Sequence, residues 1–284
     1  MTPWTRAIWV LGAVTSALVI SGCAVNPLTG EEEPMFMSVQ EELALGRQMA
    51  PEAERALQGV IPNEALQRYV DRIGQRIARV CHRPDWEYRY VVVEDPMINA
   101  FALLGGHVYV TRGILEKLTS EAQLASILAH ETVHIVARDS AAAMSKQQLM
   151  QAGLLAAAAA AASGRADPRA IGAVQLTEHF FLLQYSREDE AEADLGGLDY
   201  MVAAGYSPHG MTETMQMLME EAKIRPIEFL STHPSPENRL RYLRETIAYK
   251  HPDTQGLKVG KEEYQTTVLD FLKTHPKPRK RMGS

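Results

Sequence analysis

Near the start of the chain, apolar residues recur every three to four positions, as they do on one face of an amphipathic helix. Residues 38–41, Ser-Val-Gln-Glu, have the pattern of a capping box, which predicts a helix that begins there and runs to about residue 58. A second helix is predicted after Pro62 and Asn63, because the apolar residues between 66 and 77 keep the same period. The globular part of the chain is therefore expected to open with two helices.

The period changes to that of β-strands further along the chain. Residues 86–93 are rich in aromatic and β-branched residues, which favours a strand. Residues 100–104 and 107–111 have the same character, and the Gly-Gly pair at 105–106 provides the positive φ angles that a tight turn needs. We therefore expect one strand followed by a β-hairpin, with a short helix after Gly113.

Helical patterns dominate the second half. Ser120 caps a strong helical pattern over residues 121–144. Residues 154–162 are mostly alanine, and this run is too short and too weakly hydrophobic to indicate a membrane span. A helix that lies against another helix or a membrane surface is the more economical interpretation. The order of elements predicts an α+β fold, mostly helical, with a small antiparallel sheet.

The first residues have the features of an export signal. A basic residue precedes an uncharged apolar run at 7–20, and small residues follow before Cys23. Residues 20–23, Ile-Ser-Gly-Cys, resemble a bacterial lipobox, which implies that residues 1–22 are a lipoprotein signal peptide and that Cys23 is lipidated. Ala24 is not the aspartate that often retains lipoproteins in the inner membrane, so the outer membrane is favoured. An ordinary signal peptide with an incidental cysteine, or an uncleaved anchor, is the alternative.

The rest of the chain is expected to have three parts. Residues 23–37 are polar and rich in turn-forming residues, which predicts a lipidated tether. Residues 38–250 are predicted to form one domain. Residues 251–284 are expected to be a short C-terminal extension.

Composition narrows the possible classes of function. The chain has 284 residues, of which 46% are hydrophobic and 23% charged, so it can form a core without disulfides. Its formal net charge of -6 argues against nucleic acid as a partner, and the basic cluster at 277–281 is interpreted as a solvated tail. With Cys23 lipidated, Cys81 has no cysteine partner. A buried thiol is favoured over a reactive one or a link to another chain.

The helix predicted over 121–144 contains a motif typical of metal-dependent hydrolases. His130 and His134 are four residues apart and therefore project from the same face of a helix. Two imidazoles placed in this way can bind one Zn²⁺, and Glu131 can act beside them as a general base. The alternative is a pair of solvent-facing histidines on an ordinary helix.

A catalytic zinc needs a third protein ligand, and the acidic segment at residues 186–194 is the best candidate. Five of its residues are acidic, so they would repel one another without a cation nearby. Glu190 and Asp194 are again four residues apart, so one can bind metal while the other orients a ligating histidine. A solvated acidic start of a helix is the alternative.

The two segments together are similar to the HtpX-like family of zinc metallopeptidases, and most similar to its periplasmic lipoprotein branch. The resemblance covers nearly the whole chain after Cys23, without a tetratricopeptide-repeat domain. It rests on the following motifs: His130-Glu131-x-x-His134; Ser186-Arg187-x-x-Glu190-x-x-Ala193-Asp194; Asn26-Pro27-x-Thr29-Gly30; Asn99-Ala100-Phe101-Ala102 with Gly105-Gly106; and Thr232-His233-Pro234-Ser235-Pro236 with Arg239.

The resemblance implies a gluzincin-type domain with one zinc ion per chain. It assigns His130, His134 and Glu190 to the metal, Glu131 to the general base, and Asp194 to the support of a ligating histidine. It also implies an edge strand that faces the active-site cleft and takes up substrate as an added strand. The residues expected in that strand are Gly105, Gly106, His107, Val108, Tyr109 and Val110.

Two further residues are candidates for a role in catalysis. The resemblance makes His233 either a fourth ligand that closes the site or a group near the developing oxyanion, with a simple turn histidine as the alternative. Arg239 either assists the charge of the transition state or holds the loop of His233, and the second interpretation is favoured.

The implied function is that of a zinc-dependent endopeptidase at the periplasmic face of the outer membrane, acting on misfolded or unassembled envelope proteins. A chaperone or assembly factor with weak or regulated proteolysis is the alternative. The chain departs from the family pattern at Leu104, Val133 and Asp139, the last of which replaces a frequent histidine. None of these changes removes a ligand or the base.

Overall fold

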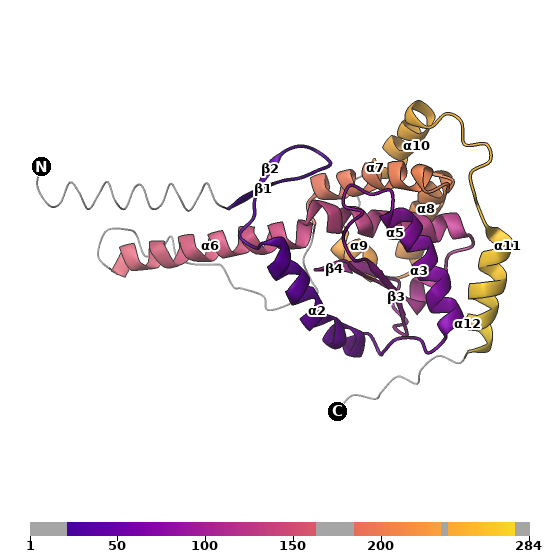
Figure 1. Cartoon of the computed structure of the whole chain (residues 1–284), viewed down its shortest axis with the longest axis horizontal. Helices are drawn as coiled ribbons and strands as arrows, with labels where there is room; N and C mark the ends of the chain where they lie inside the picture. Colours follow the sequence, from indigo (N-terminus) through magenta and orange to yellow (C-terminus); the bar gives the residue numbers. More distant parts are fainter. Residues whose placement is uncertain (1–21, 163–184, 234–237, 276–284) are drawn as a thin grey trace, which may run out of the picture.

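The computed structural model of the chain describes residues 22–162, 185–233 and 238–275 (Figure 1). Almost all of the predicted leader and the basic cluster at 277–281 lie outside these ranges. Within them, the helices are all too short or too polar to cross a membrane.

The two opening helices form where the periodicity predicts them. Helix α2 (Val39–Ala56) begins with a complete capping box, in which the side chain of Ser38 accepts from the backbone N–H of Glu41 and the Glu41 carboxylate accepts from the backbone N–H of Ser38. Helix α3 (Glu64–Ala78) is capped by Asn63, and its apolar stripe is buried in the main core. The local prediction for both helices is confirmed.

The sheet contains the predicted strands in an unexpected arrangement. Strands β3 (Arg89–Val93), β4 (Ala100–Leu103) and β5 (His107–Thr111) lie in the order β3-β5-β4. The hairpin pair β4–β5 is antiparallel, whereas β3 and β5 are parallel. The expectation of a purely antiparallel sheet is therefore wrong, because β3 pairs with the second strand of the hairpin rather than the first.

The same strand order corrects the predicted edge strand. Residues 107–111 form the central strand, with β3 paired on one side and β4 on the other, and all five residues are buried. Gly105 and Gly106 lie in the turn, with φ angles of 74° and 86°. A central strand has no free backbone groups for an added strand. The strand next to β5 in the hairpin, β4, forms one edge of the sheet.

Short helix α4 (Arg112–Leu115) leads to α5 (Glu121–Ala137), and every residue of both helices is buried. The predicted helix over 121–144 is interrupted at Arg138, whose φ of 65° places it in the left-handed region. The guanidinium of Arg138 is held by the Glu42 carboxylate at 2.7 Å and by the carbonyl of Met37. Contacts with α2 and with the residues just before it therefore favour a break that no glycine or proline marks, and α6 (Asp139–Ala162) begins after it.

Helices surround α5 on the side away from the sheet. Helix α7 (Arg187–Ala203) packs along α5, and α8 (His209–Ile224) lies beside it (Figure 1). Two further elements follow, α9 (Glu228–Thr232) and α10 (Arg239–Lys250). A mostly helical α+β architecture is confirmed.

The segment expected to be a tether is folded onto the domain. Strands β1 (Cys23–Val25) and β2 (Glu32–Pro34) form an antiparallel hairpin. Asn26, between them, is buried and donates from its amide to the Glu192 carboxylate at 2.8 Å. Met35 packs against Leu104 and the first turn of α6. The tether prediction is therefore wrong for this segment, because it has partners on α6 and α7.

The domain also extends beyond the expected boundary at residue 250. Helix α11 (Lys261–Tyr264), a π-helical turn (Gln265–Leu269) and α12 (Asp270–Thr274) follow α10. Their side chains Tyr264, Val268 and Leu272 are buried in the main core. Residues up to 275 therefore belong to the same globular unit.

Candidate metal centre

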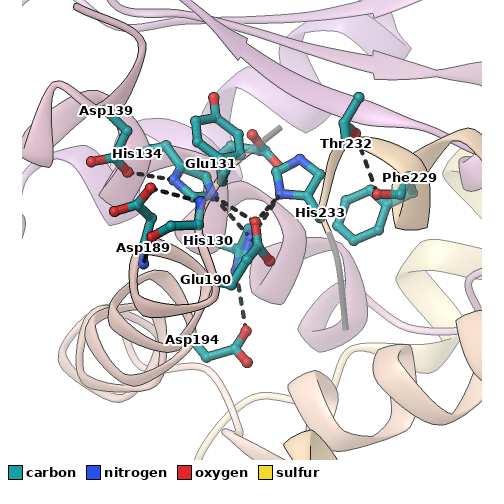
Figure 2. A network of polar contacts seen from close by, with 12 residues as sticks. His130, Glu131, His134, Asp139, Asp189, Glu190, Asp194, Phe229, Thr232 and His233 are labelled. Carbon is teal, nitrogen blue, oxygen red and sulfur yellow. Dashed lines mark hydrogen bonds and ion pairs between the residues drawn. The ribbon is translucent and has the colours of Figure 1, made fainter. Parts of the chain in front are cut away.

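Helix α5 presents both histidines of the motif on one face, as their spacing predicts. The Nε2 atoms of His130 and His134 lie 3.2 Å apart, and both rings are buried. Figure 2 shows the two rings pointing toward the same point. Two imidazole nitrogens this close repel each other unless a proton or a cation lies between them.

Two other elements complete the cluster. Glu190 projects from the first turn of α7, and its carboxylate oxygens lie 3.5 Å from His130 Nε2 and 3.6 Å from His134 Nε2. His233, at the end of α9, places Nδ1 2.7 Å from Glu190 Oε1 and 3.3 Å from His130 Nε2 (Figure 2). The structure thus brings together three predicted ligands and the predicted closing histidine.

The donor set fits a tetrahedral metal ion. One ligand atom from each of His130, His134, Glu190 and His233 lies within 4.8 Å of the others. Donors about 2.1 Å from a tetrahedral ion are separated by roughly 3.4 Å, close to most of the separations found here. Within the described residues, Glu190 Oε2 also has no hydrogen-bond partner, although Arg239 Nη1 lies 3.0 Å away. The cluster is therefore suited to a metal ion.

Glu131 lies next to the cluster without belonging to the ligand set. Both of its carboxylate oxygens are buried, and neither finds a hydrogen-bond donor in the part of the chain that the structure describes. Among the described residues, His233 Nε2 lies 3.5 Å from Glu131 Oε1. A buried carboxylate without donors is poised to accept a proton rather than to hold structure together.

His130 is oriented by a buried carboxylate, as the sequence predicts. Its Nδ1 lies 3.1 Å from Asp194 Oδ1. Arg239 donates to both oxygens of Asp194, at 2.5 and 2.6 Å, and Tyr242 donates to Oδ2. Arg239 therefore holds Asp194 and pairs with Glu190 at 3.0 Å, so among the described residues its contacts are with the carboxylates around the cluster.

His134 has a matching carboxylate that the sequence analysis recorded only as a departure from the family pattern. Its Nδ1 lies 2.6 Å from Asp139 Oδ2. A residue five positions further on would point away if the helix continued, so the left-handed break at Arg138 brings Asp139 back to His134. Sequence spacing offered no sign of this contact.

Tyr185 is the other residue that the sequence analysis missed. Its ring stacks on His134, with centroids 3.8 Å apart and planes inclined by 8°. Its hydroxyl lies 3.4 Å from that of Ser140. The ring therefore closes one face of the histidine cluster, which only the folded chain reveals.

The electrostatics of the cluster favour bound positive charge. Burial opposes the charged form of Glu190, but His233 and His130 outweigh it and hold its pKa well below the usual range. Burial also opposes protonation of His134, yet the Asp139 and Glu190 carboxylates raise its pKa to about 10. These carboxylates stabilise a cation, whether it is a proton or a metal ion.

The site is closed to solvent in this conformation. Glu131, Glu190 and His233 are all 0% exposed, and the two motif histidines are at most 3% exposed. His233 is held by stacking on Phe229, with ring centroids 4.5 Å apart, and by its contact with Glu190. A substrate can reach the cluster only if these covering groups move.

The residues predicted to bind substrate do not line the cavity beside the cluster. His107 is buried and near the carbonyl of Leu104, and burial lowers its pKa. Strand β4, not β5, borders the cavity that His233 and Tyr185 line. Cys23, the predicted lipidation site, is exposed.

Comparison with known proteins agrees with this geometry. The model of peptidase family M48 matches residues 64–247. The chain is 28% identical over 256 residues to the beta-barrel assembly-enhancing protease of Escherichia coli strain K12, which covers 87% of this chain and 52% of that protein. It is 35% identical over 180 residues to the mitochondrial metalloendopeptidase OMA1 of Schizosaccharomyces pombe, covering 62% of this chain and 52% of that protein. The chain thus spans about half the length of these relatives.

Proposed function

Because the chain belongs to peptidase family M48, we propose that it is a zinc-dependent endopeptidase. The observation that carries this proposal is the convergence of His130, His134 and Glu190 beside a buried, unpaired Glu131. Three protein ligands and an adjacent carboxylate base are the parts that zinc peptidases need. The ion is one zinc per chain.

The side chains of the centre have separate roles in peptide hydrolysis. Zinc, when bound, supplies a Lewis acid that polarises a carbonyl oxygen. Glu131 accepts the proton of the attacking water and then returns it to the leaving nitrogen. Asp194 and Asp139 fix the orientations of His130 and His134, so that both rings present Nε2 to the ion.

His233 makes the closed conformation a latent one. A catalytic zinc keeps one position for water or substrate, whereas a closed four-ligand set is typical of structural sites. His233 offers a ligand atom to the same cluster as the other three residues, so with a metal bound it would take the position that substrate needs. Activity therefore requires His233, at the end of the short α9, to leave the cluster.

The open edge of β4 is the best place for the substrate backbone. Among the described residues, β4 pairs only with β5 and so forms an edge of the sheet, which is where an added strand can pair. This edge borders the same cavity as His233 and Tyr185. The substrate strand assigned to residues 105–110 from the sequence is replaced by this one.

We place the protein at the periplasmic face of the bacterial outer membrane, anchored through a lipid on Cys23. This assignment rests on the lipobox-like residues 20–23 and on the relative whose name is beta-barrel assembly-enhancing protease. Its substrates would be misfolded or unassembled envelope proteins. Such proteins offer the extended segments that an open strand edge accepts.

The test compares three forms of the full chain, each loaded with zinc. Wild type is expected to degrade an unfolded protein slowly, Glu131→Gln to retain zinc but lose at least about 100-fold in rate, and His233→Ala to cut faster than wild type. Equal activity of Glu131→Gln and wild type would refute the mechanism. If Glu131→Gln also restores envelope assembly in cells that lack the protein, the alternative hypothesis of a chaperone or assembly factor is correct.

A further inference from the structure

Helix α6 begins in the core of the domain and continues outside it. In its first turns Ala141, Ala142 and Ser145 are buried. From Lys146 to Gly153 every side chain is exposed or half-buried. Figure 1 shows α6 projecting away from the rest of the domain, past the hairpin of β1 and β2. The outer part of α6 is therefore largely uncovered by the part of the chain that the structure describes.

The composition of this outer part is unusual for a helix that faces water. Residues 147–162 contain no charged side chain. A surface helix normally carries charged and polar residues on the face that it turns to solvent. Here Leu149 is 47% exposed and Met150 is 61% exposed. The outer part of α6 is therefore suited to contact with an apolar surface.

The N-terminal segment binds α6 one turn before these two side chains. The backbone N–H of Phe36 donates to Ser145 Oγ at 3.0 Å. Leu149 is four residues after Ser145, so it lies on the same side of the helix one turn further out. The side chain of Phe36 is itself 42% exposed. We call Phe36, Leu149 and Met150 the outer patch.

The predicted lipidation site belongs to the same end of the molecule. Cys23 is exposed and is the first residue of β1, where it pairs with Pro34. The next residue, Ala24, packs with Met35 in the cluster that includes the first turns of α6. A lipid on Cys23 would therefore be attached to folded chain without a flexible spacer. It would hold this end of the domain, with the outer patch, directly at a bilayer.

The charges near the outer patch indicate which kind of bilayer fits. Glu31 and Glu32 are exposed in the N-terminal hairpin. Lys146 lies 3.8 Å from Glu33, so its charge is partly offset by that carboxylate. Anionic lipids would be repelled by the exposed carboxylates, whereas zwitterionic lipids carry no net charge. Apolar contact therefore has to provide the attraction.

We propose that α6 and the N-terminal hairpin form a membrane-docking face, whose partner is the surface of a zwitterionic phospholipid bilayer. The lipid on Cys23 brings the face to the bilayer, and the three side chains of the outer patch enter the boundary between headgroups and acyl chains. The domain is thereby held in one orientation at the membrane. This inference rests on the lipid anchor of the proposed function, but not on peptidase activity.

The test places a fluorescent residue in the outer patch of the full chain, as bacterial cells process it. Met150→Trp is reconstituted in phosphatidylcholine vesicles with brominated acyl chains, which quench tryptophan inside the bilayer. Its emission is expected to be quenched and to shift to shorter wavelength relative to wild type. Tyr249→Trp is the matched control, because Tyr249 is 87% exposed on α10. Its emission should be the same in brominated and plain vesicles.

Further variants and conditions identify the attraction as apolar. Leu149→Glu, added to Met150→Trp, should restore most of the emission, because a carboxylate beside the probe resists burial. Ile224→Glu, at a position 79% exposed on α8, is the control and should leave the quenching unchanged. High salt or added phosphatidylglycerol should not strengthen or abolish the quenching. Quenching that needs phosphatidylglycerol and disappears in salt would overturn the proposal.

Anchoring and docking are measured separately, and neither measurement depends on cleavage. Flotation with vesicles and the mass of the N-terminal peptide report the lipid on Cys23. A chain that floats without quenching of Met150→Trp refutes the docking face and leaves the anchor intact. Quenching in a chain with unmodified Cys23 refutes the anchor and supports the docking face. A blue-shifted but unquenched emission in a dimeric chain would show that a second copy covers the outer patch, which also overturns the proposal.

Discussion

At the scale of single residues, a carboxylate lies at Nδ1 of each motif histidine, but the two carboxylates come from different helices. His130 receives its carboxylate from Asp194 on α7, and His134 receives its own from Asp139 at the start of α6. A carboxylate on Nδ1 fixes the tautomer, orients the ring and makes Nε2 a better ligand. Asp139 is therefore a positioning residue.

The contribution of Asp139 can be measured as zinc affinity. Asp139→Ala removes the support of His134 and is expected to weaken zinc binding by about 10- to 100-fold. Asp139→Asn keeps an acceptor oxygen for Nδ1 and should lose less. Competition with a chromogenic chelator gives the affinities, and the exposed Asp85→Asn serves as control. An unchanged affinity in Asp139→Ala would show that the 2.6 Å contact does not position the ligand.

At the scale of elements, close packing of α2 against the hairpin sets the position of β4. A Cβ added at Gly46 would lie 2.0 Å from the carbonyl oxygen of Leu104. Leu104 precedes the glycine turn and lines the cavity. Glycine at this position therefore lets α2 approach the hairpin closely.

Replacing Gly46 with alanine should destabilise the protein, although alanine has a higher helix propensity than glycine. Alanine in a helix is favoured over glycine by up to about 1 kcal/mol, but Gly46→Ala forces a backbone clash that costs about 1–3 kcal/mol. Urea unfolding should therefore show lower stability. Gly153→Ala is the matched control, because an added Cβ there meets no described atom within 4 Å. It should be neutral or stabilising, and a similar gain in Gly46→Ala would contradict the packing argument.

The N-terminal hairpin is joined to the ligand-bearing helix α7 through a carboxylate that titrates near neutral pH. Burial raises the pKa of Glu192 to about 7, with the Asn26 hydrogen bond opposing and the nearby Asp139 and Glu33 reinforcing the shift. The folded state thus binds this proton more tightly than the unfolded state. The resulting stability is present below pH about 4.5 and is lost as pH rises through 7.

Glu192→Gln should remove this part of the pH dependence, because glutamine mimics the protonated acid. The melting temperature of the variant relative to wild type is expected to rise between pH 5 and pH 8. Glu188→Gln, exposed on the preceding turn, is the matched control and should show no such trend. A constant difference across this pH range would mean that Glu192 does not titrate there.

At the scale of the whole molecule, the ends of the described chain are part of the fold. The hairpin at 23–34 lies against α6 and α7, and the segment at 261–274 completes the core. Arg112, itself buried, donates to the carbonyls of Leu272 and His275. The catalytic unit therefore reaches beyond the residues that carry the motifs.

Truncating the chain tests whether the fold depends on the residues after Lys250. A chain that ends at Lys250 loses the buried side chains of Tyr264, Val268 and Leu272, each of which contributes about 1.5–3 kcal/mol. Their sum approaches the whole stability of a typical domain, about 5–15 kcal/mol. This chain should lack a cooperative thermal transition, whereas one that ends at His275 should melt like the full chain. Cooperative melting of the shorter form would place the domain boundary at 250 after all.

Much of the site was predictable because its spacing is local. The four-residue intervals between His130 and His134, and between Glu190 and Asp194, follow from the helical repeat alone, and the structure brings all four together. The caps of α2, α3 and α5 are equally local, since each depends on one side chain and the N–H groups of the next turn. The sequence by itself thus determined where these three helices begin and which side chains of one helix face could meet as metal ligands.

Only the tertiary structure decided how these parts meet. The order β3-β5-β4 depends on pairing between strands distant in the chain, which moved the free edge from β5 to β4. The break at Arg138, which brings Asp139 to His134, depends on Glu42 of another helix. Such contacts cannot be predicted from the hydrophobic pattern, because that pattern describes one element at a time and each contact depends on two elements.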